Sequence, residues 1–371
     1  MKSYSERIRR RPTYLKIAVL YLFCPLLVLC GDGFDELRQQ ADAARVAHDP
    51  ATAIPLYQRA LQLNDQWAEG WGYLGNMLFV AGQFVQAEDA LHHLSDLQPG
   101  LAEGWGMRGM AAMQSGSYND AQQFFEKSLS LKFELQPAMR DVVLTNRALL
   151  LSRMGNFDAA LQIMAAFVHG GPDPALLNAL GIAALHRPWL LSDIPATDHD
   201  LVLAAGKAEF AQLAKSVDTE QLLATLEQQF PNAAGVHYLV GYAIFQTDSS
   251  RAEEEFRREL EIDPENMAAA SMLAYSLVVD HGDLGTATTL AKRAAASAPS
   301  DPGFQYVLGR VLDAEGDHKG AVAALEIAVK LNSDNVEYHV ALAAACAAAG
   351  RPQEAVSERR RALALRFGHA G

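Results

Sequence analysis

Two consecutive stretches of the chain decide its fold. Residues Ala68–Leu101 read AEGWGYLGNMLFVAGQFVQAEDALHHLSDLQPGL, and residues Ala102–Leu135 read AEGWGMRGMAAMQSGSYNDAQQFFEKSLSLKFEL. A period of 34 residues with recurring aromatic, glycine and alanine positions is typical of repeated helical hairpins. The positions that recur in register are Trp71 and Trp105, Gly75 and Gly109, Gly82 and Gly116, Phe84 and Tyr118, and Ala87 and Ala121.

The residues of one unit explain why it forms two helices. Leu74 and Leu78 are four residues apart and share a helix face. Gly82 follows where a left-handed residue ends a helix, and Pro99 cannot continue the second helix. Gly75 is small because the two helices must cross closely there. One such hairpin cannot bury its own apolar stripe, so the repeats must stack, and we expect an all-α solenoid.

This pattern resembles the tetratricopeptide repeat (TPR) family, in particular its uncharacterised secreted bacterial members. The resemblance implies an α-solenoid whose groove is lined by the first helix of each repeat and binds proteins or peptides. We expect four segments: a signal peptide or anchor over 1–33, an array of four hairpins over 34–172, an irregular segment over 173–231, and a second array of four hairpins over 232–371.

The irregular segment lacks the regular pairing of helices. Asp173–His186 reads as a first helix that no second helix follows, and Arg187–His199 reads as an ordered connection with two prolines. Val202–Lys215 and Thr219–Phe230 then form a degenerate hairpin. A long excursion of this kind is often functional or marks a change in the direction of the array.

The N-terminus predicts export. Met1–Lys16 carries six basic residues and one acidic residue, and the uncharged run Ile17–Leu29 follows it. Thirteen residues of helix span about 20 Å, short of the roughly 30 Å hydrocarbon core, which favours a signal peptide. Cys30 follows as in a lipoprotein signal, although Leu29 stands where a small residue is usual. A cleaved signal, a lipid anchor on Cys30 and an uncleaved anchor remain open, and membrane contact is expected only through residues 1–30 if they are retained.

All three alternatives place Phe34 and the residues after it outside the cytoplasm, since positive charge stays inside. The net charge of −13 argues against nucleic-acid binding, which needs basic surface, and is consistent with solubility. The three cysteines, Cys24, Cys30 and Cys346, provide no disulfide framework and no metal-binding spacing. Cys346 is expected to be a small buried hydrophobe.

The chain shows no signature of catalysis. No nucleophile elbow, P-loop, dinucleotide fingerprint or zincin motif is present. His92 and His93 are adjacent and point to different sides of a helix, so they cannot chelate one metal. Glu253–Glu255 precede Arg257 and Arg258, which predicts a solvated face with weak ion pairs. We therefore expect no enzyme activity, no cofactor and no metal.

The groove positions of the resembled family provide the candidate binding residues. Methionines and aromatic residues there suit apolar peptide segments. The acidic-tail clamp that some family members use on heat-shock chaperones is not expected, because Gly72 stands where a lysine is needed. The positions give Asn76, Phe79, Met110, Met113 and Gln114 in the N-terminal half, and Tyr238, Tyr242, Phe245, Tyr306 and Arg310 in the C-terminal half.

Two functions follow as hypotheses. The first is a non-catalytic scaffold or adaptor of the bacterial cell envelope that binds a protein or peptide and is periplasmic, secreted or membrane-anchored. The alternative is a regulatory or substrate-docking subunit of an enzyme complex, such as a glycosyltransferase, whose catalytic domain is on another chain. A cluster of titratable groups at Arg187–His199 would favour the second, and a groove with exposed aromatic residues would favour the first.

Overall fold

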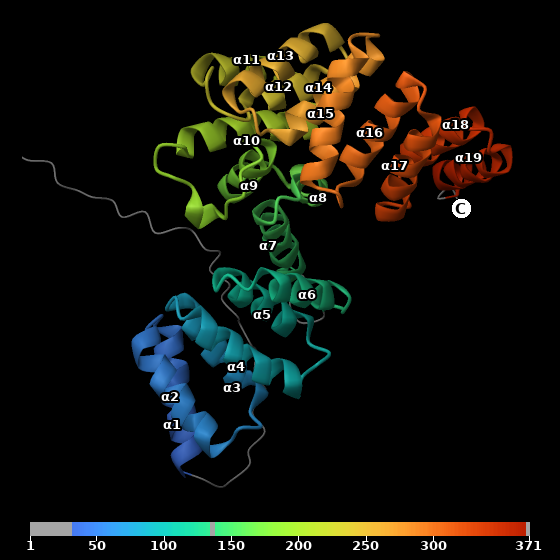
Figure 1. Cartoon of the computed structure of the whole chain (residues 1–371). Coiled ribbons are helices and arrows are strands. Elements are labelled where there is room, and N and C mark those ends of the chain that lie inside the picture. Colours follow the sequence, from blue (N-terminus) through green and yellow to red (C-terminus); the bar gives the residue numbers. More distant parts are fainter. Residues whose placement is uncertain (1–31, 134–137, 369–371) are drawn as a thin grey trace, which may run out of the picture. The chain divides into compact units, whose positions relative to one another are not determined.

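The computed structural model describes residues 32–133 and 138–368, and all regular secondary structure in these ranges is helical (Figure 1). The predicted all-α fold of stacked helical hairpins is confirmed. The chain divides into two compact units, each with its own core. The first comprises Met1–Phe167 and Arg187–Ala196, and the second comprises Val168–His186 and Thr197–Gly371.

The first unit contains four helical hairpins. Each odd-numbered helix pairs with the next one, and each hairpin packs on its successor. At the turns inside the hairpins, Gly82 and Gly116 adopt the left-handed conformation (φ +76° and +87°), as their spacing predicts. The helices are α1 (Asp32–Val46), α2 (Pro50–Leu63), α3 (Ala68–Val80), α4 (Phe84–Leu97), α5 (Ala102–Gln114), α6 (Tyr118–Leu129), α7 (Met139–Arg153) and α8 (Phe157–Ala165).

The second unit contains five hairpins and the single helix α11 between the first two of them. In seven of its helices an Asp or Asn side chain before the first turn accepts a hydrogen bond from a backbone N–H, which fixes where the helix begins. The helices are α9 (Pro174–Ala184), α10 (His199–Leu213), α11 (Thr219–Gln229), α12 (Val236–Ile244), α13 (Ser249–Ile262), α14 (Met267–Val279), α15 (Leu284–Ser297), α16 (Pro302–Glu315), α17 (His318–Leu331), α18 (Val336–Ala348) and α19 (Pro352–Phe367).

In several hairpins the two helices cross at a glycine, as the repeat pattern indicates. A Cβ atom on Gly75 would lie 2.6 Å from the Cγ atom of Leu91, and one on Gly309 would lie 2.5 Å from the Cγ atom of Leu325. Both distances are far below van der Waals contact. Gly109 approaches Phe125 in the same way, so the crossing recurs along the chain.

The expectation that Asp173–His186 has no partner helix is wrong. Helix α9 pairs closely with α10, and here backbone meets backbone: a Cβ atom on Gly181 would lie 1.9 Å from the carbonyl oxygen of Val202, and one on Gly206 would lie 1.8 Å from that of Leu177. The residues between the two helices hide this pairing from the sequence period. Gly206 was the available signal, since it supplies the second small residue of the crossing.

Part of the intervening connection belongs to the first unit. A short 3₁₀ helix forms at Leu191–Asp193, and the guanidinium group of Arg153 on α7 donates a 2.6 Å hydrogen bond to the carbonyl oxygen of Pro188. The carboxylate of Asp193 caps the backbone N–H of Leu190 at 3.0 Å and lies 4.0 Å from Arg153. These contacts hold the connection in place as a structural element.

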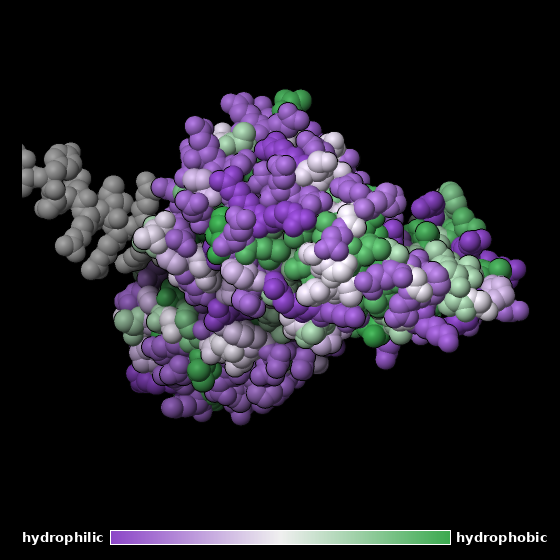
Figure 2. All heavy atoms as spheres, turned by 45° about the horizontal axis from the view of Figure 1, so that its top comes forward, coloured by the Kyte–Doolittle hydropathy of each residue, from purple (hydrophilic) through white to green (hydrophobic). Residues whose placement is uncertain are grey.

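Hydrophilic residues cover most of the face seen in Figure 2, with hydrophobic residues gathered in smaller areas between them. Cys346 is 1% exposed, as expected of a small buried hydrophobe. Among the described residues, no helix is both long and apolar enough to cross a bilayer. The predicted export signal, with Ile17–Leu29 and Cys30, lies outside the described residues.

The backbone crossing of α9 and α10 makes a testable prediction. Gly181→Ala should destabilise the protein by about 3 kcal/mol, because the new methyl group must push the helices apart. Gly72→Ala is the control, since its Cβ atom would lie 3.4 Å from Leu94, and alanine favours a helix over glycine by about 1 kcal/mol. Urea unfolding followed by circular dichroism measures both. Equal effects of the two substitutions would contradict the close crossing.

Candidate functional site

Four aromatic side chains form a continuous row in the second unit, which we call the aromatic row: Phe245, Tyr275, Tyr306 and Tyr338. Their ring centroids are 5.6, 6.0 and 5.1 Å apart in chain order. Phe245 is the residue that follows α12, and the three tyrosines lie on α14, α16 and α18 in chain order. Each of these four helices is the first helix of its hairpin. All four are partly exposed, so the row presents ring surface across four repeats.

The row crosses its helices diagonally. The steps along the sequence are 30, 31 and 32 residues (275 − 245, 306 − 275 and 338 − 306), shorter than the 34-residue period. Each aromatic residue therefore lies nearer the beginning of its helix than the one before. This is why analysis at fixed repeat positions identified Phe245 and Tyr306 but missed Tyr275 and Tyr338.

Arg310 lies beside the centre of the aromatic row. One terminal nitrogen of its guanidinium group donates hydrogen bonds to the phenol oxygens of Tyr306 (2.8 Å) and Tyr275 (3.5 Å), and the group lies 5.5 and 5.8 Å from the centroids of the Tyr275 and Tyr306 rings. Burial raises the pKa of Tyr306 to about 12, so its phenol is neutral at physiological pH. The site therefore combines flat apolar surface with a fixed cation.

The structure places the other predicted C-terminal residues differently. Tyr242 is 50% exposed and is available for contact. Tyr238 is only 7% exposed, because its ring packs between His186 (4.5 Å between centroids) and Phe256 (6.3 Å). The prediction that Tyr238 lines the groove is therefore wrong.

The predicted N-terminal residues show a similar division. Asn76, Met110 and Gln114 are partly exposed, and ligand contact by them remains a prediction. Phe79 is also partly exposed, with its ring packed edge-on against Phe84 at 5.3 Å. Met113 is 2% exposed and belongs to the core, so its assignment to the groove is wrong.

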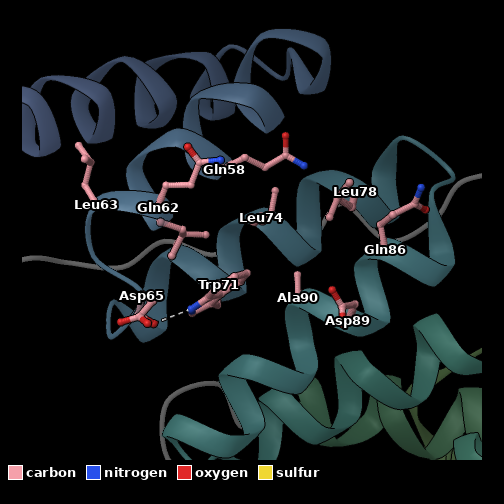
Figure 3. Close-up of a pocket in the computed structure, with 11 residues that line it drawn as sticks. Gln58, Gln62, Leu63, Asp65, Trp71, Leu74, Leu78, Gln86, Asp89 and Ala90 are labelled. Carbon is pink, nitrogen blue, oxygen red and sulfur yellow. Dashed lines mark hydrogen bonds between the residues drawn. The ribbon is translucent and has the colours of Figure 1, made fainter.

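A separate groove of about 830 Å³ lies in the first unit (Figure 3). Its lining comes from α2, α3 and α4. The buried apolar part consists of Leu61, Leu74, Leu78 and Ala90, and glutamine and aspartate side chains lie around it. The indole N–H of Trp71 donates a 2.8 Å hydrogen bond to the carbonyl oxygen of Asp65, and its ring stacks on His93 at 4.1 Å. His93 is thus a packing partner of the tryptophan.

The hydrogen bond of Trp71 recurs at one position in five repeats. Each donor lies four residues before the crossing position of its helix and donates to the carbonyl oxygen six residues earlier, in the connection between hairpins. We call this contact the latch. The pairs are Trp71 with Asp65 (2.8 Å), Trp105 with Pro99 (3.0 Å), His237 with Pro231 (2.8 Å), Gln305 with Pro299 (3.2 Å) and His339 with Ser333 (2.9 Å).

A buried polar cluster surrounds one latch residue. His237 is completely buried on α12, and its Nδ1 lies 2.7 Å from a carboxylate oxygen of Glu255 on α13. Burial by itself lowers the pKa of His237, but the hydrogen bonds to Glu255 and Pro231 raise it above its ordinary value. The expectation of a solvated Glu253–Glu255 face is thus wrong for Glu255, which is 7% exposed. Glu253 does form a surface pair with Arg257 at 2.8 Å.

Among the described residues, Glu227, His237 and Glu255 form the one group of histidine, cysteine or carboxylate side chains close enough to hold a metal ion. Sequence motifs do not predict this group, because its members come from three helices and their spacing matches no motif. The group is not in the connection over Arg187–His199, where a titratable cluster would have favoured the enzyme-subunit hypothesis.

Glu209 on α10 is 5% exposed, and burial raises its pKa from the ordinary value of 4.5 to about 7. Because the folded-state pKa is the higher one, the wild type loses stability as the pH rises from 4.5 through 7. The difference of 2.5 pKa units corresponds to about 3 kcal/mol. Relative to the wild type, Glu209→Gln should therefore gain up to that amount between pH 4.5 and pH 8 in urea unfolding.

The exposed Glu254 on α13 provides the control for this pH dependence. Glu254→Gln should follow the wild-type curve of stability against pH. Parallel curves for Glu209→Gln and the wild type would show that the carboxyl group of Glu209 is hydrated in the folded protein.

Comparisons with known proteins agree with these repeats. Family models described as Tetratricopeptide repeat match residues 38–100 and 102–134, and the model of the Anaphase-promoting complex, cyclosome, subunit 3 matches residues 280–359. No curated protein matches the chain. Similar solved structures include MamA of strain AMB-1, 24% identical, covering 43% of this chain and 95% of that one with a TM-score of 0.37. MamA from Desulfovibrio magneticus RS-1 is 19% identical, covering 46% and 97%, with a TM-score of 0.39.

The matched repeats and the stacked hairpins define an α-helical repeat protein built for protein interaction. The chain is a tetratricopeptide-repeat protein, and it is a protein-interaction scaffold.

Proposed function

We propose that the protein is a non-catalytic scaffold of the bacterial cell envelope that binds an extended protein or peptide segment along the aromatic row. The observation that supports this most directly is the continuity of the row: four partly exposed rings at spacings of 5.1 to 6.0 Å span four successive repeats. Aromatic and arginine side chains are enriched among the residues that dominate binding energy at interfaces.

The chemistry of the row suits a peptide with both apolar side chains and accessible carbonyl groups. Tyrosine rings provide contact area at a low cost in side-chain entropy, since two torsion angles fix them. The guanidinium group of Arg310 has five N–H donors, so it can donate to a peptide carbonyl or carboxylate while keeping its bond to Tyr306. No step of this binding requires an acid, a base or a nucleophile.

Peptides selected from a random phage-displayed library on the full-length chain test this proposal. Their affinity is then measured by fluorescence polarisation. Tyr306→Ala should weaken binding about 30-fold, the effect of losing an aromatic hot spot of about 2 kcal/mol. Because Tyr306 also packs on its neighbours, Tyr338→Ala, at the end of the aromatic row, provides a second variant, and it should also weaken peptide binding.

Leu63→Ser is the matched control, because Leu63 is 61% exposed and lines the separate groove of the first unit. It should leave peptide affinity unchanged. Loss of binding in Leu63→Ser with full binding in both tyrosine variants would assign the binding surface to that groove and contradict the proposal.

We also propose that the protein works outside the cytoplasm, on the basis of the basic residues before the apolar run Ile17–Leu29. An alkaline phosphatase reporter fused after Gly371 needs disulfides and is active only in an oxidising compartment. The full chain should give an active fusion, and deletion of residues 1–33 should abolish the activity. Reporter activity that survives the deletion would contradict export.

A further inference from the structure

We propose that Glu227, His237 and Glu255 bind one divalent transition-metal ion of the zinc type. Each residue comes from a different helix, α11, α12 and α13, and each offers one ligand atom. These three atoms lie within 4.8 Å of one another. One imidazole nitrogen and two carboxylate oxygens form a ligand set that zinc accepts, with a water molecule as the fourth ligand.

The orientation of His237 is the one that a ligating histidine needs. Its Nε2 donates to the carbonyl oxygen of Pro231 at 2.8 Å, which fixes the proton on that nitrogen. The other nitrogen, Nδ1, then faces Glu255 at 2.7 Å and becomes a ligand once its proton is lost. Ligating histidines in proteins are oriented in this way by a hydrogen bond from the second ring nitrogen to a carbonyl or carboxylate.

The distances require only small movements. Tetrahedral zinc with bonds of about 2.0 Å holds its ligand atoms about 3.3 Å apart. The ligand atoms here lie between 2.7 Å and 4.8 Å apart. Rotation of the two glutamate side chains closes the difference of roughly 1.5 Å without moving the helices. Glu227 is partly exposed, so an ion and its water ligand can enter from that side.

The charges around the group are balanced in the absence of a metal. Arg251 on α13 lies 3.3 Å from Glu227 and 3.7 Å from Glu255, and Arg258 on the same helix lies 3.9 Å from Glu227. The nearby carboxylate of Glu259 accepts hydrogen bonds from the backbone N–H of Gly235 and the amide of Asn266. An entering ion displaces the proton of His237 and turns the two arginines, which are about half exposed, toward solvent.

The chain contains a matched site that lacks the third ligand. His339 lies three periods after His237 (339 − 237 = 102 = 3 × 34), forms the same latch with Ser333, and faces Glu358 at 2.6 Å. Among the described residues, no third histidine, cysteine or carboxylate completes a metal-binding group there. The histidine–glutamate pair is therefore sufficient for the structure of the repeat without a metal ion. Glu227 supplies the third ligand, which makes the first site a metal site.

Metal titration of the purified, chelator-treated full-length chain tests the proposal. Zn²⁺ binding is followed by calorimetry. Co²⁺ bound in place of Zn²⁺ gives a visible absorption band if the ion has the proposed four ligands, three from the protein and one water molecule. We expect one specific ion per chain, with affinity at least about tenfold weaker in His237→Gln and in Glu227→Gln. Gln305 occupies the equivalent position and keeps the latch bond, so His237→Gln preserves the fold of the repeat.

His339→Gln is the matched control and should retain the full affinity and the Co²⁺ absorption band. Arg251→Gln should tighten binding, because it removes a positive charge next to two ligands. The proposal is overturned if the wild type binds no ion, if Glu227→Gln binds as tightly as the wild type, or if His339→Gln loses as much affinity as His237→Gln.

Discussion

The close crossing of two helices at a residue without a side chain is the constraint on which the hairpins α3–α4, α5–α6, α9–α10, α12–α13 and α16–α17 depend. At Gly75, Gly241 and Gly309 an added Cβ atom would come within 2.5 to 2.8 Å of a side chain on the second helix. A crossing this close leaves room for one large side chain from the second helix and fixes the distance between the helices. Crossings of this kind, at Gly241 and Gly309, lie in two of the four hairpins that carry the aromatic row, where Phe245, Tyr275 and the later aromatic residues meet across repeats.

The latch holds the connection between hairpins, and it depends on a donor rather than on a residue type. The indole of Trp71, the amide of Gln305 and the imidazole of His339 all donate to the carbonyl oxygen six residues earlier. Each bond satisfies a carbonyl oxygen in a turn, where the backbone has no helical partner. The repeat therefore keeps its geometry where its sequence pattern has faded, and the conspicuous tryptophans are structural residues.

The sequence predicts the fold where the period is intact. The hairpins at Ala68–Leu97 and Ala102–Leu129 follow directly from the recurrence of glycine and aromatic residues. The prediction fails for α9, because the segment before α10 breaks the period although Gly181 and Gly206 still fit together. A local pattern identifies α9 as the first helix of a hairpin. It cannot show that α10, which follows after a long connection, packs against α9 as its second helix.

The candidate site was harder to predict than the fold, for a geometric reason. A family position specifies a place on one helix, whereas exposure depends on the neighbouring repeat. Met113 and Tyr238 occupy groove positions and are buried by adjacent helices. Tyr275 and Tyr338 lie off those positions and still join the aromatic row, because the row shifts by two to four residues relative to the period in each repeat.

Helix α11 lies where the repeat is irregular, and it does not form a hairpin with a partner helix as the other helices of the second unit do. Only Leu223 and Leu226 of this helix are buried, so apolar packing fixes it less firmly than the helices of a full hairpin. Glu227 follows Leu226 directly and connects α11 to α13 through Arg251 and Arg258. Charged groups at this junction thus add ion pairs to the packing of α11 on α10 and α12. Since a bound ion joins all three helices at once, it would stabilise the part of the second unit that packing stabilises least.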